Sequence, residues 1–275
     1  MKTIVAPVAF DGLSENAAYY AASLAEKTGA RVILLHLYTI PLPAGDIPLP
    51  PEEYAELLEQ NKNDMNNFAL KIQSEFPGVK FEKDISGHLM GPQLSETIKV
   101  LRPDLVVMGV HHVNAAARFF SAANVGGMIE HMRVPMLIVP AEAKFNGFRN
   151  IVLTVDYLLD GTADFTLLRE IAAPWKAAIS LLTIVPEKNM LPEYHDVVSS
   201  LQLYRQLENV QPDLAYETNI DETAGIIAFI KKQSTDLVVM IHHRRNLIER
   251  IVERSITKTT VYAIPVPVLV LPEER

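Results

Sequence analysis

The sequence predicts an α/β protein made of two tandem open, doubly wound parallel sheets of five strands each, with flanking helices. The first observation is an internal repeat, because Asp104–Met108 recurs as Asp236–Met240. The second is that Val134–Pro140 recurs as Val266–Pro272, at the same distance from the first motif in both halves. The third is the alternation of short, continuous apolar runs with helical segments, which is typical of parallel strands joined by right-handed crossovers.

In the first half, an apolar strand over residues 3–8 precedes a helix over Ser14–Lys27, whose alanines recur at helical spacing and which Gly29 ends. Prolines between residues 41 and 51 exclude regular structure before a long helix over Glu52–Gln73. The remaining expected elements are strands at 32–37, 79–85, 105–109 and 136–139, a helix from Pro92 to Val100, and a helix ending near Met132.

The second half repeats this order after a linker over Ala141–Arg149, and its start, Asn150–Tyr157, parallels Thr3–Phe10. We therefore expect one domain over residues 1–142 (the first repeat) and another over 148–275 (the second repeat). The expected elements are strands near Ile151, Ile179, Leu214, Leu237 and Val268, with a shorter second helix over Val197–Leu207.

Composition and charge exclude several classes of function. Hydrophobic residues make up 49% of the chain and charged residues 21%, which is typical of a globular protein. The net charge of -8 argues against binding to nucleic acid or to an anionic membrane, since both require a basic surface. The chain contains no cysteine, which fits a reducing compartment. No signal peptide or apolar run of membrane-spanning length is visible, so we expect a cytoplasmic protein.

Three segments resemble the universal stress protein family. They are Ile4–Phe10 with the helix start Ser14–Ala17, the second-strand motif Leu34–His36, and the closing motif Val-Pro-x-Leu-hydrophobic-hydrophobic-Pro at 134–140 and 266–272. The resemblance covers both halves and implies a pseudo-twofold pair of domains within one chain. In the family, the strands that correspond to those after Pro135 and Pro267 form the edge at which two domains pair. The resemblance therefore implies that the two domains of this chain pair with each other. A homodimer of the whole chain and unidentified protein partners remain open.

The nucleotide-binding branch of this family ends its first strand in Pro-x-Asp and carries a G-x2-G-x9-G-[S/T] loop after the fourth strand. The resemblance places Ala9 at the aspartate position of the first repeat, and His112, Ala122 and Ala123 in the loop. A side chain at the second loop glycine occupies space that phosphates need. The first repeat is therefore a weak nucleotide candidate, and its corresponding residues are Pro7, Leu37, Met108 and Gly109.

In the second repeat, the resemblance places Asp156 at the aspartate position and Ser255 at the hydroxyl position of the motif. Ile241, Arg244 and Arg254 stand where the family motif has its three loop glycines. An arginine there either contacts phosphate or belongs to an exposed face paired with Glu249 and Glu253. The candidate site for ATP or AMP consists of Thr154, Asp156, Ile184, Met240, Arg244, Arg254 and Ser255.

The repeated histidine pairs His111-His112 and His242-His243 suggest a metal site, but neighbouring strand residues point to opposite faces, so we expect none. No hydrolase elbow, Walker loop or zinc-protease motif is visible, and no catalytic residue is expected. The first hypothesis is thus a non-enzymatic stress-response protein that acts through its surfaces. The alternatives are an ATP or AMP sensor that uses the second repeat and, less favoured, a metal-binding module.

Overall fold

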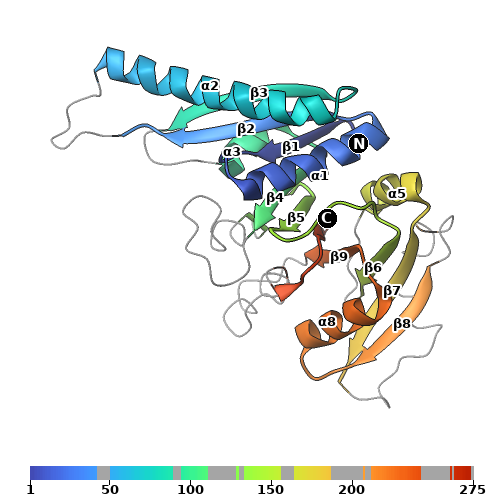
Figure 1. The fold of residues 1–275 in the computed structure, drawn as a ribbon. Coiled ribbons are helices and arrows are strands. Elements are labelled where there is room, and N and C mark those ends of the chain that lie inside the picture. Colours follow the sequence, from blue (N-terminus) through green and yellow to red (C-terminus); the bar gives the residue numbers. More distant parts are fainter. Residues whose placement is uncertain are drawn as a thin grey trace. The chain divides into compact units, whose positions relative to one another are not determined.

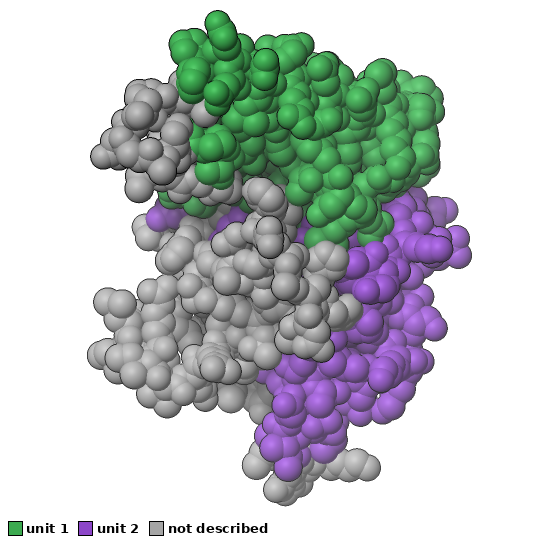
Figure 2. All heavy atoms as spheres, turned by 60° about the vertical axis from the view of Figure 1, so that its left-hand side comes forward, with its two compact units in different colours: residues 1–108 green, residues 109–275 purple. Residues whose placement is uncertain are grey.

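The computed structural model describes residues 1–41, 50–88, 94–110, 128–129, 133–155, 164–186, 207, 212–242, 261 and 263–273. The chain divides into two compact units, unit 1 over residues 1–108 and unit 2 over residues 109–275, which Figure 2 shows in different colours. Each unit is an α/β assembly of strands and helices (Figure 1). No helix in the described part of the chain is both long and apolar enough to cross a membrane.

Unit 1 is a parallel sheet with the strand order β3-β2-β1-β4. Helices α1 and α2 lie on one face of this sheet (Figure 1), and leucines of α3 pack on the other face, against Val5, Ile33, Leu35 and Leu37. The last two residues of β4 belong to unit 2. The elements are β1 (Thr3–Pro7), α1 (Gly12–Thr28), β2 (Arg31–Thr39), α2 (Pro51–Glu75), β3 (Lys80–His88), α3 (Leu94–Leu101) and β4 (Leu105–Val110).

Helix α1 begins and ends where its sequence signals predict. The Asp11 carboxylate accepts a hydrogen bond from the Ser14 backbone N–H at 2.8 Å, and the Ser14 hydroxyl completes a reciprocal capping box. Gly29 ends the helix with a φ of 73°, a left-handed conformation that glycine adopts without steric cost. Its alanine-rich face is buried, so α1 lies close to the sheet.

Unit 2 has the strand order β5-β10-β9-β6-β7-β8. Its second-repeat strands run β8-β7-β6-β9, which reproduces the order of unit 1. Of the expected helix near Met132, residues 128–129 are helical and the remainder is outside the described residues, as is the expected helix at 197–207 except Leu207. The elements are β5 (Met136–Pro140), β6 (Asn150–Thr154), α5 (Thr166–Ala172), the 3-10 helix η1 (Ala173–Trp175), β7 (Ala178–Val185), β8 (Asp213–Thr218), α8 (Glu222–Gln233), β9 (Leu237–His242) and β10 (Val268–Pro272).

The strand registers confirm the internal repeat. Ile4 of β1 lies opposite Leu105 of β4, and its counterpart Ile151 of β6 lies opposite Leu237 of β9. The pairing of β1 with β2 matches that of β6 with β7 in the same way. Since a shift of one residue would exchange the two faces of a strand, equal registers mean that equivalent side chains face equivalent layers in the two repeats.

Strands β5 and β10 pair in antiparallel orientation inside unit 2. Leu137 lies opposite Leu269, which is the same position in the repeated motif, and Ile138 lies opposite Val268. An antiparallel pair in which equivalent residues face each other has a local twofold axis between them. This geometry confirms the pairing of the closing strands that the family resemblance implies.

The aspartate of the repeated Asp-Leu-Val-Val-Met motif holds the first strand of each repeat. One carboxylate oxygen of Asp104 accepts hydrogen bonds from the backbone N–H groups of Lys2 at 2.7 Å and Thr3 at 2.8 Å. Asp236 accepts equivalent bonds from Arg149 and Asn150, both at 2.9 Å. The motif is therefore repeated because both sheets need the same acceptor where their central strands begin.

We expect Asp104→Asn to reduce the dependence of stability on acid pH. Burial alone would raise the pKa of Asp104, but the N–H groups of Lys2 and Thr3 and the nearby positive charges lower it below its usual value. The stabilisation is thus complete above the unfolded-state pKa of about 3.9 and is lost as the pH falls through the lower folded-state value. Solvent screening limits the effect to about 0.5–1 kcal/mol.

Urea unfolding between about pH 2 and pH 6 measures this effect, with the exposed Asp64→Asn in α2 as the control. The wild type and Asp104→Asn should differ near neutral pH and converge in acid. A constant difference across this range would show that the Asp104 carboxylate does not stabilise the strand.

Candidate functional site

Each repeat has a point at which its strand order reverses, between β1 and β4 in unit 1 and between β6 and β9 in unit 2. Parallel sheets of this kind bind ligands beyond the carboxyl ends of the strands at such a point. The candidate residues can therefore be compared repeat by repeat.

In unit 1 the structure brings Pro7, Leu37 and Met108 to one face of the sheet. Pro7 lies opposite Leu35, two residues before Leu37, and Val5 lies opposite Val106, two residues before Met108. Because side chains alternate along a strand, all three share the face covered by α3. Leu37 is 8% exposed and Met108 is 1% exposed, so the set is apolar and closed. Gly109 follows Met108 in β4, is buried, and belongs to the opposite face.

In unit 2 the equivalent residues Thr154, Ile184 and Met240 also share one face, as the registers of β6 with β7 and β9 require. This set differs in polarity and exposure. Thr154 is half-buried and its hydroxyl donates to the Val239 carbonyl at 3.3 Å, and Ile184 is half-buried as well. Met240 is 4% exposed.

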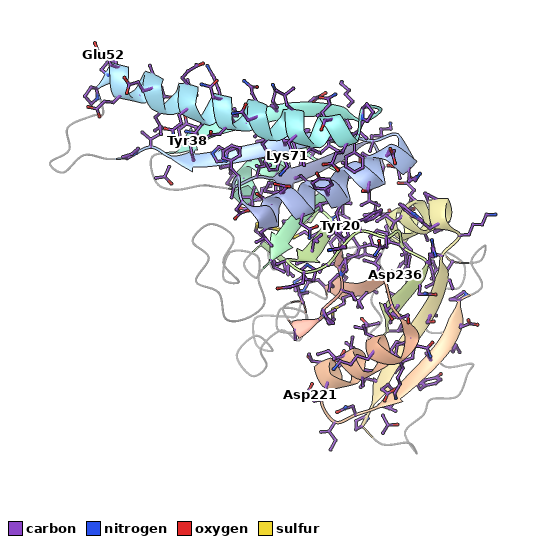
Figure 3. The ribbon with its side chains drawn as sticks, in the orientation of Figure 1. Tyr20, Tyr38, Glu52, Lys71, Asp221 and Asp236 are labelled. Carbon is purple, nitrogen blue, oxygen red and sulfur yellow. The ribbon has the colours of Figure 1, made fainter. Side chains whose placement is uncertain are left out.

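Helix α8 determines where Ile184 lies. A Cβ atom added at Gly225 of α8 would come within 2.9 Å of the Ile184 Cγ2 atom, so the helix backbone packs directly on this side chain. Asp221 caps the helix by accepting from the Ala224 N–H at 2.8 Å, and Figure 3 labels it at the start of α8. Glycine at position 225 therefore brings the helix close to β7.

Four residues of the candidate site are outside the described residues, namely Asp156, Arg244, Arg254 and Ser255. The same holds for His111, His112 and His243. His242, the last residue of β9, is 8% exposed. Among the residues that the structure describes, no group of three histidine or carboxylate side chains is placed to hold a metal ion.

Sequence reasoning missed an aromatic cluster at the exit of β1. Phe10 has a φ of 57°, a left-handed conformation that is strained for a bulky residue, and its ring lies 4.2 Å from the His36 ring centroid and 6.0 Å from that of Phe68. Tyr38 stacks on His36 with centroids 6.2 Å apart. Burial, followed by a hydrogen bond with Tyr54, raises the pKa of Tyr38. These contacts direct the chain after β1 toward α2, and no local sequence signal announces them.

The fold therefore defines a tandem α/β protein in which the strand order of each repeat reverses at one point. The model of the Universal stress protein family matches residues 1–140 and 147–272, and the chain belongs to this family. No curated protein sequence matches the chain significantly.

Two solved structures are similar to nearly the whole chain. One is a universal stress protein from Archaeoglobus fulgidus DSM 4304, with a TM-score of 0.70, 15% identity, and coverage of 98% of this chain and 96% of that one. The other is a functionally unknown protein from Pseudomonas aeruginosa PAO1, with a TM-score of 0.59, 14% identity, and coverage of 99% and 93%. At these identities the likeness establishes the fold.

Proposed function

We propose that the protein is a non-enzymatic stress-response protein that acts through its surfaces, and that its first repeat does not bind a nucleotide. The observation that supports this most directly is the closed apolar set of Leu37 and Met108 at the switch point of unit 1. Ala9, at the position where nucleotide-binding relatives carry aspartate, offers no acceptor to a base or ribose.

A second candidate function is adenine nucleotide sensing by the second repeat. This function is favoured by Thr154 and Ile184, which are half-buried. Their counterparts in unit 1, Pro7 and Leu37, are buried. A hydroxyl and a half-buried apolar side chain at the carboxyl ends of neighbouring strands suit a nucleoside, which needs both a polar partner and an apolar face. Asp156 and Ser255 would supply the charged and hydroxyl contacts.

Calorimetric titration of the full chain with ATP and with AMP separates the two functions. If the protein is a non-enzymatic stress-response protein that acts through its surfaces, neither nucleotide binds at millimolar concentration and no phosphate is released from ATP. Under the second, binding occurs and Asp156→Ala weakens it about 10–100-fold, the factor expected for a lost charged hydrogen bond.

Asp213→Ala is the matched control, because Asp213 is exposed at the amino end of β8, opposite to the ligand-binding end of the sheet. It should leave any nucleotide affinity unchanged. Tight binding that neither Asp156→Ala nor Ser255→Ala weakens would refute the site, and sustained ATP turnover would refute the non-enzymatic function.

A further inference from the structure

Asn146 is the only asparagine in the chain that a glycine follows. It is exposed and lies in the segment 143–148, which has no regular secondary structure and joins β5 to β6. Gly147, the next residue, is buried and has a φ of 85°. The pair therefore places an accessible side-chain amide beside a backbone position that carries no side chain.

An asparagine before a glycine can react with its own backbone. The backbone nitrogen of the glycine attacks the side-chain carbonyl carbon of the asparagine, the new C–N bond closes a succinimide ring, and ammonia leaves with the proton of the attacking nitrogen. Water then opens the ring at one of its two carbonyl groups. One opening gives aspartate, and the other gives isoaspartate, whose main chain is longer by one carbon atom. Glycine favours ring closure because it has no Cβ atom to obstruct the attack.

The two groups that would react at Asn146 are not held by hydrogen bonds. Among the residues that the structure describes, neither the Asn146 side chain nor the backbone N–H of Gly147 has a hydrogen-bond partner. The backbone N–H groups shortly after them differ, since those of Arg149 and Asn150 both donate at 2.9 Å to Asp236, which Figure 3 labels. The nitrogen that must attack is thus unengaged, although the chain is fixed close by.

Asp11 shows how the fold restrains the same chemistry at another position. Aspartate before glycine forms the same succinimide, with water as the molecule that leaves, and Asp11 precedes Gly12. Its carboxylate, however, caps α1 and accepts a hydrogen bond from the Ser14 N–H at 2.8 Å. The capping box holds this carboxyl group in place. Asn146 has no such restraint, so the two pairs should differ in reactivity.

We propose that Asn146 is a site of spontaneous deamidation in the folded protein, and that its isoaspartyl product releases the linker from Trp175. The linker is held by contacts among aromatic rings. The centroids of Phe145 and Phe148 lie 5.4 Å apart, and each lies 5.7 Å from that of Trp175. Asn146 lies between the two phenylalanines in the chain, so an isoaspartyl linkage lengthens the main chain that joins their rings.

The packing at Trp175 does not accommodate a longer main chain. A Cβ atom added at Gly147 would come within 2.6 Å of the Trp175 ring, so the backbone already packs directly on the indole. Because closely packed groups are displaced by a single added carbon, the isoaspartyl form should separate the rings. The aspartyl form keeps the length of the main chain and only adds a negative charge, near the exposed Lys144 and Arg149.

Peptide mapping by mass spectrometry tests the modification in the full-length protein. Trypsin cleaves after Lys144 and Arg149 and so isolates the peptide 145–149. After incubation of the folded protein in mildly alkaline buffer, this peptide should contain aspartyl and isoaspartyl forms, and a protein isoaspartyl methyltransferase should label only the second. Digestion in water enriched in heavy oxygen marks any deamidation that occurs during the digestion itself.

Two controls show whether the reaction is specific. The tryptic peptide 63–71 carries Asn63 and Asn67, which are exposed on α2, and it should remain unmodified. Asn146→Gln should lose both products, because its longer side chain would have to close a larger ring, whereas Asn67→Gln should keep them. The proposal is overturned if peptide 145–149 from the folded protein stays unmodified while the urea-unfolded chain reacts, or if peptide 63–71 reacts equally.

Fluorescence tests the release of the linker, because Trp175 is the only tryptophan in the chain. The deamidated fraction, separated by ion exchange, should emit at longer wavelength than the unmodified protein and be quenched more strongly by acrylamide. Freshly purified Asn146→Asp, which supplies the charge without the longer main chain, should emit like the wild type. Unchanged emission of the deamidated fraction, or an equal shift in Asn146→Asp, would refute the effect assigned to isoaspartate.

Discussion

Leu137→Ala and Leu269→Ala are each expected to destabilise the protein by about 2–5 kcal/mol, and their effects should not add. Both side chains are fully buried and lie opposite each other in the antiparallel pair of β5 and β10. Once one is truncated, the other has already lost part of its packing surface. A coupling energy of about 0.5–3 kcal/mol is therefore expected from chemical unfolding of the two single variants and the double variant.

Leu24→Ala provides the control for this cycle. Leu24 is also fully buried, but it lies in α1 of unit 1 and is not paired with Leu269. The combination of Leu24→Ala with Leu269→Ala should be additive within about 0.5 kcal/mol. Additivity of the Leu137 and Leu269 substitutions would instead indicate that the register of β5 and β10 is wrong.

Gly147→Ala is the second substitution with a large expected effect. Gly147 lies in the expected linker with a φ of 85°, and a Cβ atom there would come within 2.6 Å of the Trp175 ring. That ring packs edge-on against Phe145 and Phe148. Alanine thus combines backbone strain with overpacking, and we expect a loss of about 2–4 kcal/mol, measured by thermal and urea unfolding.

Gly12→Ala is the matched substitution, because a Cβ atom at Gly12, the first residue of α1, would meet no atom within 4 Å. It should leave stability unchanged or raise it by up to about 1 kcal/mol. Equal effects of the two substitutions would mean that the aromatic cluster does not confine the linker at Gly147.

The fold was predictable because its signals are local or repeated. Continuous apolar runs specified the buried strands, Gly29 marked the end of α1, and the recurrence of Asp104 as Asp236 related the two halves. The strand order in both repeats and the antiparallel pairing of β5 with β10 agree with that prediction. Boundaries were less predictable, since β3 continues through Gly87 to His88 rather than ending near residue 85.

The candidate site was predictable only in part. Repeat equivalence placed Thr154, Ile184 and Met240 on one face, because register follows from the apolar pattern. The packing of Gly225 on Ile184 joins residues that are distant in the sequence, and nothing in the local pattern signals it. The same is true of His36 and Asn61, whose partnership depends on how α2 crosses β2.

The pairing of Leu137 with its own counterpart Leu269 also bears on what would happen if the gene were cut between the repeats. Each fragment would carry an uncovered edge of five mostly apolar residues, Met136–Pro140 or Val268–Pro272. The local twofold axis between β5 and β10 already pairs equivalent residues of the two repeats. A single fragment can therefore cover its exposed edge by pairing with a second copy of itself. Mixed fragments would then choose between self-association and reconstitution of the native pair.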